Sequence, residues 1–519
     1  MNYLKFQPKK RRNSFGAGGR LLDVFLSLIF LLFFYTTSVQ AATKTWNTTT
    51  GGAWTTGSNW SPTGAPAAND DVIINSNQSA SITGLPTISL NSLTVSGNCR
   101  LEAAASGNTL TITGTLSVAS TYTLALGNTN ARMEFTLAST ATGTINGTGV
   151  INFDAGSTQR DFLVAGDLTI APGALLTDLN GGNGSFFTLS AGATLRIGNT
   201  AGITTSGATG AVQLTGSRIY SAGAKYEYNG TAAQVTGNGL TQNTAASLKI
   251  NNSAGVSLSA ATTISGLLTM QSGTLNMANL NLTVGSLTGT SNITNSSGTA
   301  GARTLTIGSD NTSPAAYSGV ISNGTATSLA LTKNGTGTLT LAGSNSYTGL
   351  TTIAAGTLKL GAAGTSPNSP LGTIAAGTSI TAGGSLDLNG FTLPINEALT
   401  LRGTGISSGG ALTNSSATSA TYSGLITLGA ASSIITNAGD IVISNTGTIS
   451  GATFGLTVGG SGNGSTASII GTTSGTVTKI GTGSWTFSAN STYTGLTTIS
   501  AGTLKLGAAG SGANTPLGT

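Results

Sequence analysis

Carboxylates are the side chains whose type and spacing come closest to supporting catalysis in this chain. Its 519 residues include no histidine, which removes Ser-His-Asp and Cys-His nucleophile systems and the usual transition-metal sites. Paired acids could still act on polysaccharides. Acids concentrate at Asp70 and Asp71, which we interpret as a turn pair, and across Asp154, Asp161 and Asp167. The members of the second group are much closer together in the sequence than the length of one turn of a repeat structure, so they should not stack above one another on successive turns. We therefore predict no catalytic residue.

Other features that could hold an ion or a reactive group have simpler interpretations. The glycine-rich segments 181–184 and 459–464 are similar in composition to Ca²⁺-binding repeats, but neither contains the aspartate that such turns need, so we interpret them as flexible turns. No Gly-Lys-Ser/Thr follows a glycine-rich stretch, so no phosphate loop is expected. Cys99 is the sole cysteine and is expected to be a packed side chain. We predict no cofactor and no bound metal.

Two residue types leave binding functions open. Trp46, Trp54 and Trp60 lie near the start of the chain, where they either cover the first turn of a repeat structure or form a platform that stacks on sugars. We favour the cover, because the end of an open repeat structure exposes apolar side chains and unpaired backbone. Regular Thr-x-Thr ladders would favour ice binding, but here they recur irregularly, as expected for a solvated strand face.

Composition indicates the elements that must position these residues. The chain has 77 glycines, 7% charged residues and 5% aromatic residues, so good helix formers are scarce. Short segments of alternating character, such as TLTIT at 109–113 and NLNLTV at 279–284, lie between Gly, Asn and Ser residues. We therefore predict an all-β fold.

The start of the chain, residues 1–41, has the layout of a secretory signal peptide. Basic residues precede the apolar run 21–35, which is short for a membrane span and contains Asp23, and Val39-Gln40-Ala41 precedes Ala42. We expect export through the secretion machinery and no stable membrane span after cleavage. Most of the chain's positive net charge lies in this leader, so the near-neutral remainder argues against a nucleic-acid partner.

A long duplication shows that the chain is built from repeats. Residues 332–373 align without gaps on residues 478–519, with 28 of 42 positions identical. Within the first copy, three short predicted strands lie at 339–341, 351–353 and 357–360. We predict that the three together form one turn of a β-solenoid, in which each unit is too small to bury its own core and is completed by its neighbours.

The duplicated pattern resembles the autotransporter-associated β-strand repeat of large exported bacterial proteins. In the first copy it is carried by Lys333, Gly335, Gly337, Leu339, Leu341, Asn345, Tyr347, Gly349, Thr351, Ile353, Gly356, Leu358 and Leu360. In the second copy the matching positions include Lys479, Gly481, Gly483, Tyr493, Gly495, Gly502, Leu504 and Leu506. The second copy departs from the pattern at Trp485, Phe487 and Ser491. The resemblance implies a right-handed parallel β-helix with a role at the cell surface, and it supplies no catalytic residues.

These observations predict three parts of the chain. Residues 1–41 form the signal peptide, residues 42–105 a Trp/Gly-rich β module that caps the solenoid, and residues 106–519 the solenoid itself. The autotransporter-associated repeats occupy residues 329–373 and 475–519. Because the second copy stops at Thr519 in mid-turn, we expect further sequence beyond it, such as an anchoring, sorting or translocator domain.

The predicted function is a non-catalytic, secreted or cell-surface repeat protein of a Gram-negative bacterium that acts as an adhesin or stalk through many weak contacts. Its partner would be a surface ligand, whether a glycan, a host or neighbouring cell, or an abiotic surface. The alternatives are a β-helix enzyme that acts on polysaccharide as a lyase or hydrolase, and an ice-binding β-solenoid. Adhesion without turnover, release of oligosaccharides and thermal hysteresis distinguish the three.

Overall fold

The fold was analysed in a computed structural model of the whole chain, which describes residues 41–127, 131–153, 161–178, 184–297 and 301–519. Contacts divide the chain into two units, Met1–Ala42 and Thr43–Thr519. The predicted signal peptide lies outside the described residues, except for its last position. Within the described residues, none of the helices has the length and hydrophobicity needed to cross a bilayer.

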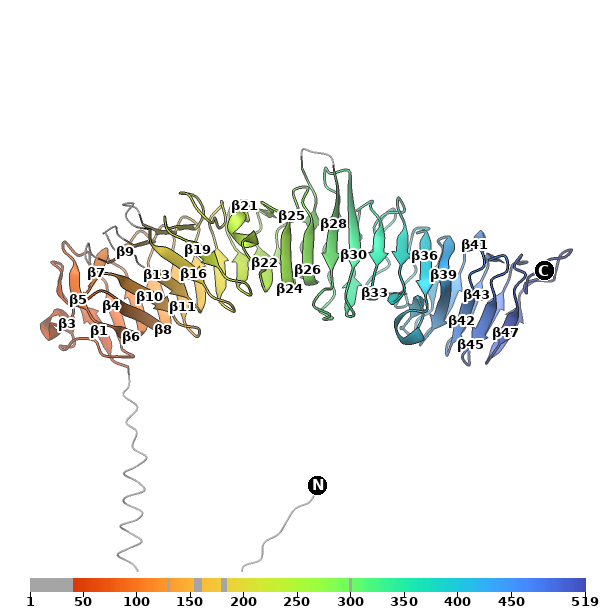
Figure 1. Cartoon of the computed structure of the whole chain (residues 1–519), viewed down its shortest axis with the longest axis horizontal. Helices are drawn as coiled ribbons and strands as arrows, with labels where there is room; N and C mark the ends of the chain where they lie inside the picture. Colours follow the sequence, from red (N-terminus) through yellow and green to blue (C-terminus); the bar gives the residue numbers. More distant parts are fainter. Residues whose placement is uncertain (1–40, 128–130, 154–160, 179–183, 298–300) are drawn as a thin grey trace, which may run out of the picture. The chain divides into compact units, whose positions relative to one another are not determined.

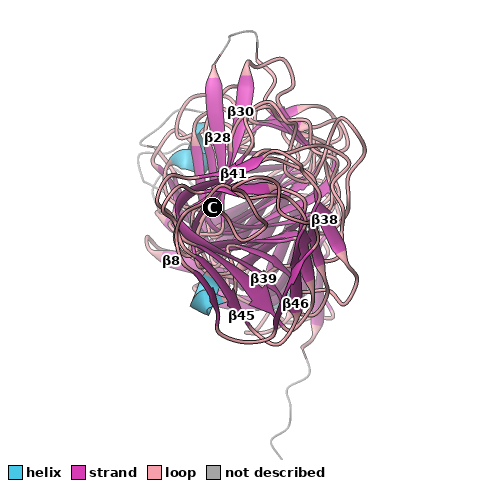
Figure 2. Ribbon diagram, turned by 90° about the vertical axis from the view of Figure 1, so that its right-hand side faces the viewer, coloured by secondary structure: helices cyan, strands magenta, loops and turns pink. Residues whose placement is uncertain are grey.

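The second unit is a β-solenoid of about 18 turns, as the sequence predicts. Its strands follow one another in chain order, from β1 at the red end of Figure 1 to β47 at the blue end. Figure 2 shows the strands of successive turns lying behind one another. Strands of neighbouring turns pair in parallel, and one turn contributes up to three strands, as β10, β11 and β12 do before β13, β14 and β15 stack on them.

The largest sheet has 31 strands and contains two of the stacked columns. In chain order these strands are β1 (Thr43–Trp46), β3 (Trp60–Ser61), β4 (Asp71–Ile74), β6 (Ile88–Val95), β8 (Asn108–Val118), β10 (Met133–Leu137), β11 (Thr142–Ile145), β13 (Asp161–Val164), β14 (Asp167–Ile170), β16 (Phe186–Leu189), β17 (Thr194–Ile197), β19 (Arg218–Tyr220), β20 (Lys225–Tyr228), β22 (Ser247–Asn251), β24 (Thr262–Ser272), β26 (Leu282–Gly289), β28 (Ala302–Ile307), β30 (Ser328–Lys333), β31 (Thr338–Leu341), β32 (Thr351–Ile353), β33 (Gly356–Leu360), β34 (Thr378–Ile380), β35 (Gly384–Asp387), β36 (Leu399–Gly403), β37 (Leu412–Asn414), β39 (Ile426–Thr436), β41 (Thr448–Ser450), β42 (Leu456–Gly460), β44 (Ile469–Gly471), β45 (Val477–Ile480) and β47 (Thr497–Ile499).

Three smaller parallel sheets form the remaining column. The first contains β2 (Gly52–Ala53), β5 (Ile82–Leu85), β7 (Cys99–Ala103), β9 (Thr123–Leu126), β12 (Val150–Phe153), β15 (Leu175–Thr177) and β18 (Val212–Gln213). The second contains β21 (Gln234–Val235), β23 (Val256–Ser257), β25 (Leu275–Asn276), β27 (Ile293–Thr294) and β29 (Ile321–Ser322), and the third contains β38 (Ala420–Tyr422), β40 (Ile441–Ile443), β43 (Gly464–Thr466), β46 (Ser484–Phe487) and β48 (Thr503–Leu506). In the described part of the chain the helices are single 3₁₀ turns, η1 (Gly57–Asn59), η2 (Asn238–Thr241) and η3 (Ile406–Ser408).

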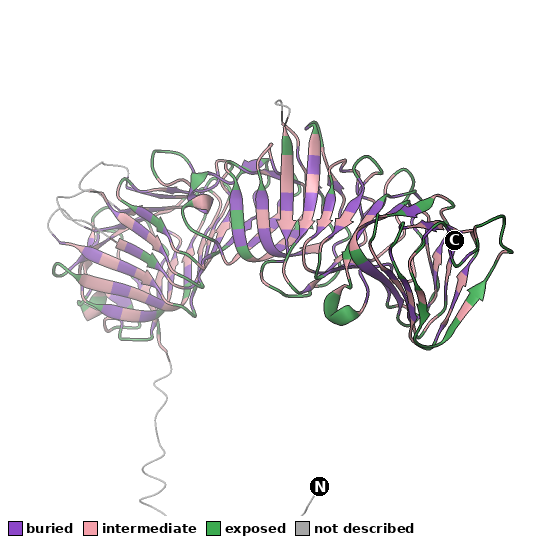
Figure 3. Ribbon diagram, turned by 45° about the vertical axis from the view of Figure 1, so that its right-hand side comes forward, coloured by how far each residue is buried: buried purple, intermediate pink, exposed green. Residues whose placement is uncertain are grey.

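Alternation of side chains along each strand builds the core. In β33, Leu358 and Leu360 are buried and Lys359 between them is partly exposed, and the same alternation recurs in most strands of Figure 3. In-register pairing then places like residues above one another: Phe135 of β10 pairs with Phe162 of β13, which pairs with Phe187 of β16. A continuous apolar interior results, because each turn covers the residues that its neighbour cannot bury alone.

The register corrects the predicted boundaries of one turn. Leu339 of β31 pairs with Leu358 of β33, and Leu331 of β30 pairs with Thr351 of β32. The prediction that the segments 339–341, 351–353 and 357–360 form a single turn is therefore wrong, because the first and third lie in the same column on successive turns. Both segments carry the Thr-Leu-x-Leu pattern, and in-register stacking of like residues explains why they meet.

The tryptophans near residue 50 form a buried cluster beside the first strands. Trp60 contacts Trp46 and Trp54 edge-on, with ring centroids 4.8 Å apart in both pairs, and each of the three side chains is 1% exposed. Trp60 Nε1 donates to the carbonyl of Trp54 over 2.8 Å. β1 pairs in parallel with β4 and in the antiparallel sense with β3. The alternative that these rings form a sugar-stacking platform is wrong, since their faces are not accessible.

Candidate functional site

The first candidate region is the duplicated motif, in which a buried lysine binds backbone carbonyls. Lys333 is 1% exposed, and its ammonium donates to the carbonyls of Asn334, Gly335 and Ala355 over 2.6, 2.8 and 3.2 Å. Burial lowers the pKa of Lys333 to about 8, and the charge of Asp310 opposes that shift. The carbonyl of Ala355 belongs to the segment that enters β33, so the lysine joins one turn to the next.

Lys479 repeats this geometry in the second copy of the motif. Its ammonium donates to the carbonyls of Ile480, Gly481 and Ala501 over 2.7, 2.9 and 3.1 Å, and burial lowers its pKa. The motif tyrosines also act alike: Tyr347 Oη and Thr351 Oγ1 lie 2.7 Å apart, and Tyr493 Oη and Thr497 Oγ1 lie 2.6 Å apart. The motif lysines therefore join neighbouring turns, and each motif tyrosine bonds a threonine four residues further along the same turn.

The motif glycines lie where the backbone of one turn meets that of another. At six of them a Cβ atom would lie 1.9–2.5 Å from a backbone oxygen, namely Gly335, Gly337, Gly349, Gly481, Gly483 and Gly495. Gly356 and Gly502 also have φ angles of +67° and +71°, and a Cβ would lie 2.4 Å from the carbonyl oxygens of Gly335 and Gly481. Side chains at these positions would force the turns apart.

The departures in the second copy have local explanations. Asn345 is buried and links β29 to the turn at Pro370, since its Oδ1 accepts from the Ile321 amide and its Nδ2 donates to the Pro370 carbonyl. Ser491 keeps one of these links by accepting from the Ile470 amide over 3.2 Å. Trp485 lies over Gly464, where a Cβ would be 2.2 Å from the ring. Leu358 and Leu360 are buried in the first copy, whereas Leu506 is 54% exposed because β48 pairs on one side, with β46.

The structure keeps apart the acids singled out in the sequence, as far as it describes them. Asp70 Oδ2 accepts from the Ala67 amide over 2.8 Å, as expected of a turn residue. Asp161 lies in β13 and Asp167 in β14, which belong to different columns, and Asp154 lies outside the described residues. Among the residues that the structure describes, no three acidic or Cys side chains are grouped so that they could hold a metal ion.

The remaining sequence candidates are structural where they are described. Cys99 is buried, and burial raises the pKa of its thiol to about 12. Gly460 ends β42 and Gly464 begins β43, where it is packed under Trp485, so the turn predicted for segment 459–464 is confined to residues 461–463. Of segment 181–184, the first three residues lie outside the described part of the chain.

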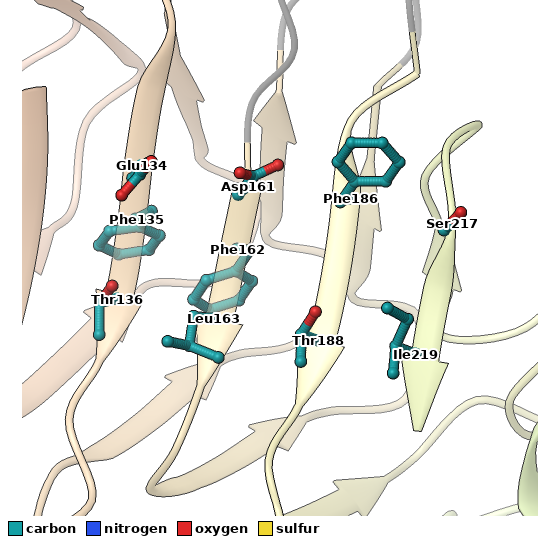
Figure 4. Close-up of a pocket in the computed structure, with 10 residues that line it drawn as sticks. All are labelled: Glu134, Phe135, Thr136, Asp161, Phe162, Leu163, Phe186, Thr188, Ser217 and Ile219. Atoms are coloured by element: carbon teal, nitrogen blue, oxygen red, sulfur yellow. The ribbon is translucent and has the colours of Figure 1, made fainter. Parts of the chain in front are cut away.

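The second candidate region is an open groove of about 410 Å³ on the outer face of β10, β13, β16 and β19 (Figure 4). Side chains at its rim and walls include Glu134, Asp161, Phe186, Ser217 and Ile219. Leu163 and Ile219 are 37% and 44% exposed, which is unusual on strands whose outward residues are otherwise mostly polar. This volume is within the range of ligand sites, about 300–1,000 Å³.

Buried aromatic side chains pack under the groove and form its floor. Phe135 and Phe162 stack with ring centroids 4.9 Å apart, and Phe162 and Phe187 meet at 6.0 Å. The next inward residue of the column is Arg218, 2% exposed, whose Nε donates to the Leu214 carbonyl and whose Nη1 donates to Thr204 Oγ1. The outward side chains of the groove therefore belong to strands whose inward side chains are buried and packed against one another.

One arginine lies beside both carboxylates of the groove. Arg132 Nη2 is 3.3 Å from Glu134 Oε1 and also pairs with Asp161 Oδ2. This cluster could not be predicted from the sequence, because Glu134 and Asp161 are distant in the chain and meet through the pairing of β10 with β13. The alternation of Met133-Glu134-Phe135 and of Asp161-Phe162 indicates that Glu134 and Asp161 both point outward. To predict that they are neighbours, one must also know the number of residues in the turn that separates them.

Outward threonines do not form a regular array on this face. Thr111, Thr136, Leu163, Thr188 and Ile219 follow one another in register across five strands. Two aliphatic side chains interrupt the threonines, so the repeated hydroxyl spacing that ice binding needs is not present in this column.

Comparison with protein families matches three segments of the chain, with two family models. Residues 331–360 and 477–506 match the passenger-associated-transport-repeat, and residues 45–155 match a domain of unknown function (DUF8693). Comparisons with curated proteins and with solved structures found no match. The two repeat matches fall on the segments that contain the lysine and tyrosine contacts described above.

Parallel stacking of small units, each completed by its neighbours, defines the chain as a β-solenoid repeat protein. The two matched segments show that the chain contains passenger-associated-transport repeats, which supports the resemblance to autotransporter-associated repeat proteins seen in the sequence.

Proposed function

We propose that the chain is a non-catalytic display protein of the outer surface of a Gram-negative bacterium, where it acts as an adhesin or stalk. The observation that carries the proposal is the passenger-associated-transport-repeat at residues 331–360 and 477–506, within a continuous parallel ladder. Each added turn of such a ladder presents further outward polar side chains. Many weak contacts in a row bind more tightly than any one of them through their high effective concentration.

Export by a secretion system and a surface ligand complete this proposal. The ligand would be a glycan, a host or neighbouring cell, or an abiotic surface. No nucleic acid is expected as partner, because the mature chain has a near-neutral charge.

One observation favours a second candidate, an enzyme acting on polysaccharide. Glu134 and Asp161 face the same open groove from adjacent strands, and paired carboxylates are the usual catalytic groups of glycoside hydrolysis. Against it, both carboxylates are ion-paired with Arg132. Measuring whether the chain cleaves polysaccharide therefore distinguishes the enzyme from the adhesin.

The test uses the exported full chain attached to inert beads. Beads are incubated with bacterial cells, immobilised polysaccharides and mineral surfaces, and both retention and the release of reducing sugar ends or unsaturated products are measured. We expect retention above uncoated beads with no released product. Released product would replace the proposal by the enzyme, and absence of both retention and product would contradict the adhesin.

A further inference from the structure

The outward side chains of the groove form two rows of four across four turns. Register aligns Glu134 with Asp161 and Asp161 with Phe186, with Ser217 just before β19 at the next level. The second row is Thr136, Leu163, Thr188 and Ile219. Figure 4 shows these side chains standing along the strands, with Phe186 beside Asp161. Acceptors, a phenyl ring, hydroxyls and aliphatic groups thus face one groove.

The apolar members of these rows indicate a ligand with an apolar face. Leu163 is 37% and Ile219 is 44% exposed, and Phe186 is partly exposed between them. Large apolar side chains gathered in a concave site, with few polar groups, are typical of ligand sites. The ring of Phe186 can cover the C–H face of a sugar while polar groups at its edge remain free for hydrogen bonds.

Charge at the groove disfavours anionic ligands. Two of the ten described lining residues are acidic and none is basic. The neighbouring Arg132 is engaged by both Glu134 and Asp161, which leaves the three-residue group with a net charge of −1. A carboxylate oxygen accepts several hydrogen bonds, so the partly exposed Glu134 and the Oδ2 atom of the partly exposed Asp161 can still accept from hydroxyl groups, whereas Asp161 Oδ1 is buried. Uronates and sulfated sugars would instead meet like charge.

The spacing of the strands fits an extended chain of sugars. Parallel strands lie about 4.8 Å apart, so four strands span about 14 Å. This strand spacing is close to the length of one pyranose unit in an extended, β-linked chain. Successive sugars could then meet successive strands, in the order carboxylate, carboxylate, phenyl ring and hydroxyl.

We propose that the groove on β10, β13, β16 and β19 binds a neutral, extended oligosaccharide of pyranose units along the direction in which the turns are stacked. One sugar face lies on Phe186, and hydroxyls of neighbouring units donate to Glu134 and Asp161. This assignment names the ligand class of the adhesin and rests on the function proposed above.

The test measures binding of defined sugars to the full exported chain by isothermal titration calorimetry. The neutral probes are cellohexaose and mannohexaose, and the anionic probe is hexagalacturonate. We expect at least one neutral probe to bind and hexagalacturonate not to bind. Phe186→Ala should weaken that binding about tenfold through loss of the ring contact. Leu425→Ala is the matched control, because Leu425 is 44% exposed and lies outside the groove.

A gain of binding provides an independent readout. Thr188→Arg places a cation in the groove, so the variant should bind hexagalacturonate while its circular dichroism spectrum stays that of the native chain. Unaltered affinity in Phe186→Ala, binding of hexagalacturonate by the native chain, or no binding of either neutral probe would each overturn the proposal.

The same variants separate this proposal from the proposed function. If Phe186→Ala loses neutral-sugar binding and bead retention together, both stand. If the native chain is retained on surfaces but binds none of the neutral probes, the adhesin stands and the oligosaccharide is wrong. Neutral-sugar binding without any retention of the beads would overturn the adhesin and leave the groove assigned.

Discussion

Two buried charged side chains stand out among the residues of this solenoid, Lys333 and Glu397, because charges rarely leave water without partners. Lys333 replaces its water shell with three backbone carbonyls, an arrangement that Lys479 repeats. Glu397 is 1% exposed, and its Oε1 accepts from Thr378 Oγ1 over 3.0 Å, while its Oε2 has no hydrogen-bond partner among the described residues. One charge is thus satisfied and the other is not.

We expect Lys333→Met to destabilise the turns around it by about 2 kcal/mol, since three carbonyl acceptors would lose their donor inside the protein. Hydrogen exchange of the amides at 331–360 measures the local free energy of opening. Lys505→Met is the control, because Lys505 is exposed and surface changes cost less than about 0.5 kcal/mol. Equal effects of the two variants would contradict the structural role of the ammonium.

Glu397 makes stability depend on pH. Burial raises the pKa of Glu397 from 4.5 to about 7, and the nearby phenols of Tyr347 and Tyr422 stay neutral because burial raises their pKa values as well. Between these two values the folded chain binds more protons than the unfolded chain, so this group's stabilising contribution is present below pH 4.5 and is lost as pH rises towards 7.

Glu397→Gln should therefore match the native chain near pH 4.5 and be more stable than it at pH 7.5. Urea unfolding followed by circular dichroism at the two pH values gives the comparison. A stability difference between variant and native chain that is the same at both pH values would show that Glu397 titrates as an ordinary glutamate.

Single residues differ in how far the sequence reveals their roles. The inward positions Leu358 and Leu360 follow from alternation alone, and the turn role of Asp70 follows from its place before a strand. The acceptor role of the carbonyls around Lys333 could not be predicted, because a lysine in a mostly polar sequence is expected on the surface. The contact of Arg132 with Asp161 likewise depends on a pairing between turns.

Between elements, the distance of closest approach is set by glycines such as Gly356. Its φ of +67° disfavours any side chain, and a Cβ would also lie 2.4 and 2.5 Å from the carbonyl oxygens of Gly335 and Gly337. Gly383, in the turn before β35, has a similar φ of +94° but no atom within 4 Å of a Cβ. Substitutions at Gly383 and Gly356 therefore distinguish the cost of backbone strain alone from the added cost of a steric clash between turns.

Gly383→Ala should cost about 1–2 kcal/mol, the strain of a left-handed conformation alone. Gly356→Ala should cost about 3 kcal/mol or more, because the turns must also move apart. Thermal unfolding and local hydrogen exchange measure both variants. Costs of equal size would mean that β31 and β33 tolerate a wider separation than the structure indicates.

Strands were more predictable than their register. Segment 109–113 lies within β8, whereas segment 279–284 is strand only from Leu282, where β26 begins; the all-β fold is confirmed. The predicted turn was wrong for residues 339–360, and turn length varies along the chain, since Leu358 pairs with the nearby Leu339 on one side and with the more distant Leu386 on the other. Because loops of different lengths connect strands that all pair in parallel with the next turn, the sequence has no single repeat length from which the register could be predicted.

In the whole unit, each turn contacts its immediate neighbours, and stability is a sum of local interfaces. We therefore expect the exchange protection lost in Gly356→Ala to be confined to β30–β35 and the turns beside them. Amides at 43–127 and the fluorescence of the buried Trp46, Trp54 and Trp60 should stay native. Loss of protection along the entire unit would mean that the ladder unfolds as one cooperative body.

The direction of the hydrogen bonds between turns has a mechanical consequence. Because parallel pairing joins each turn to the next, tension applied along the stack loads these interfaces in series, and the weakest one yields first. A released turn, such as the one from Leu358 to Leu386, supplies up to about 90 Å of additional length. Under tension such a ladder would lengthen one turn at a time. Each step would lower the force on the contact at its far end before that contact dissociates.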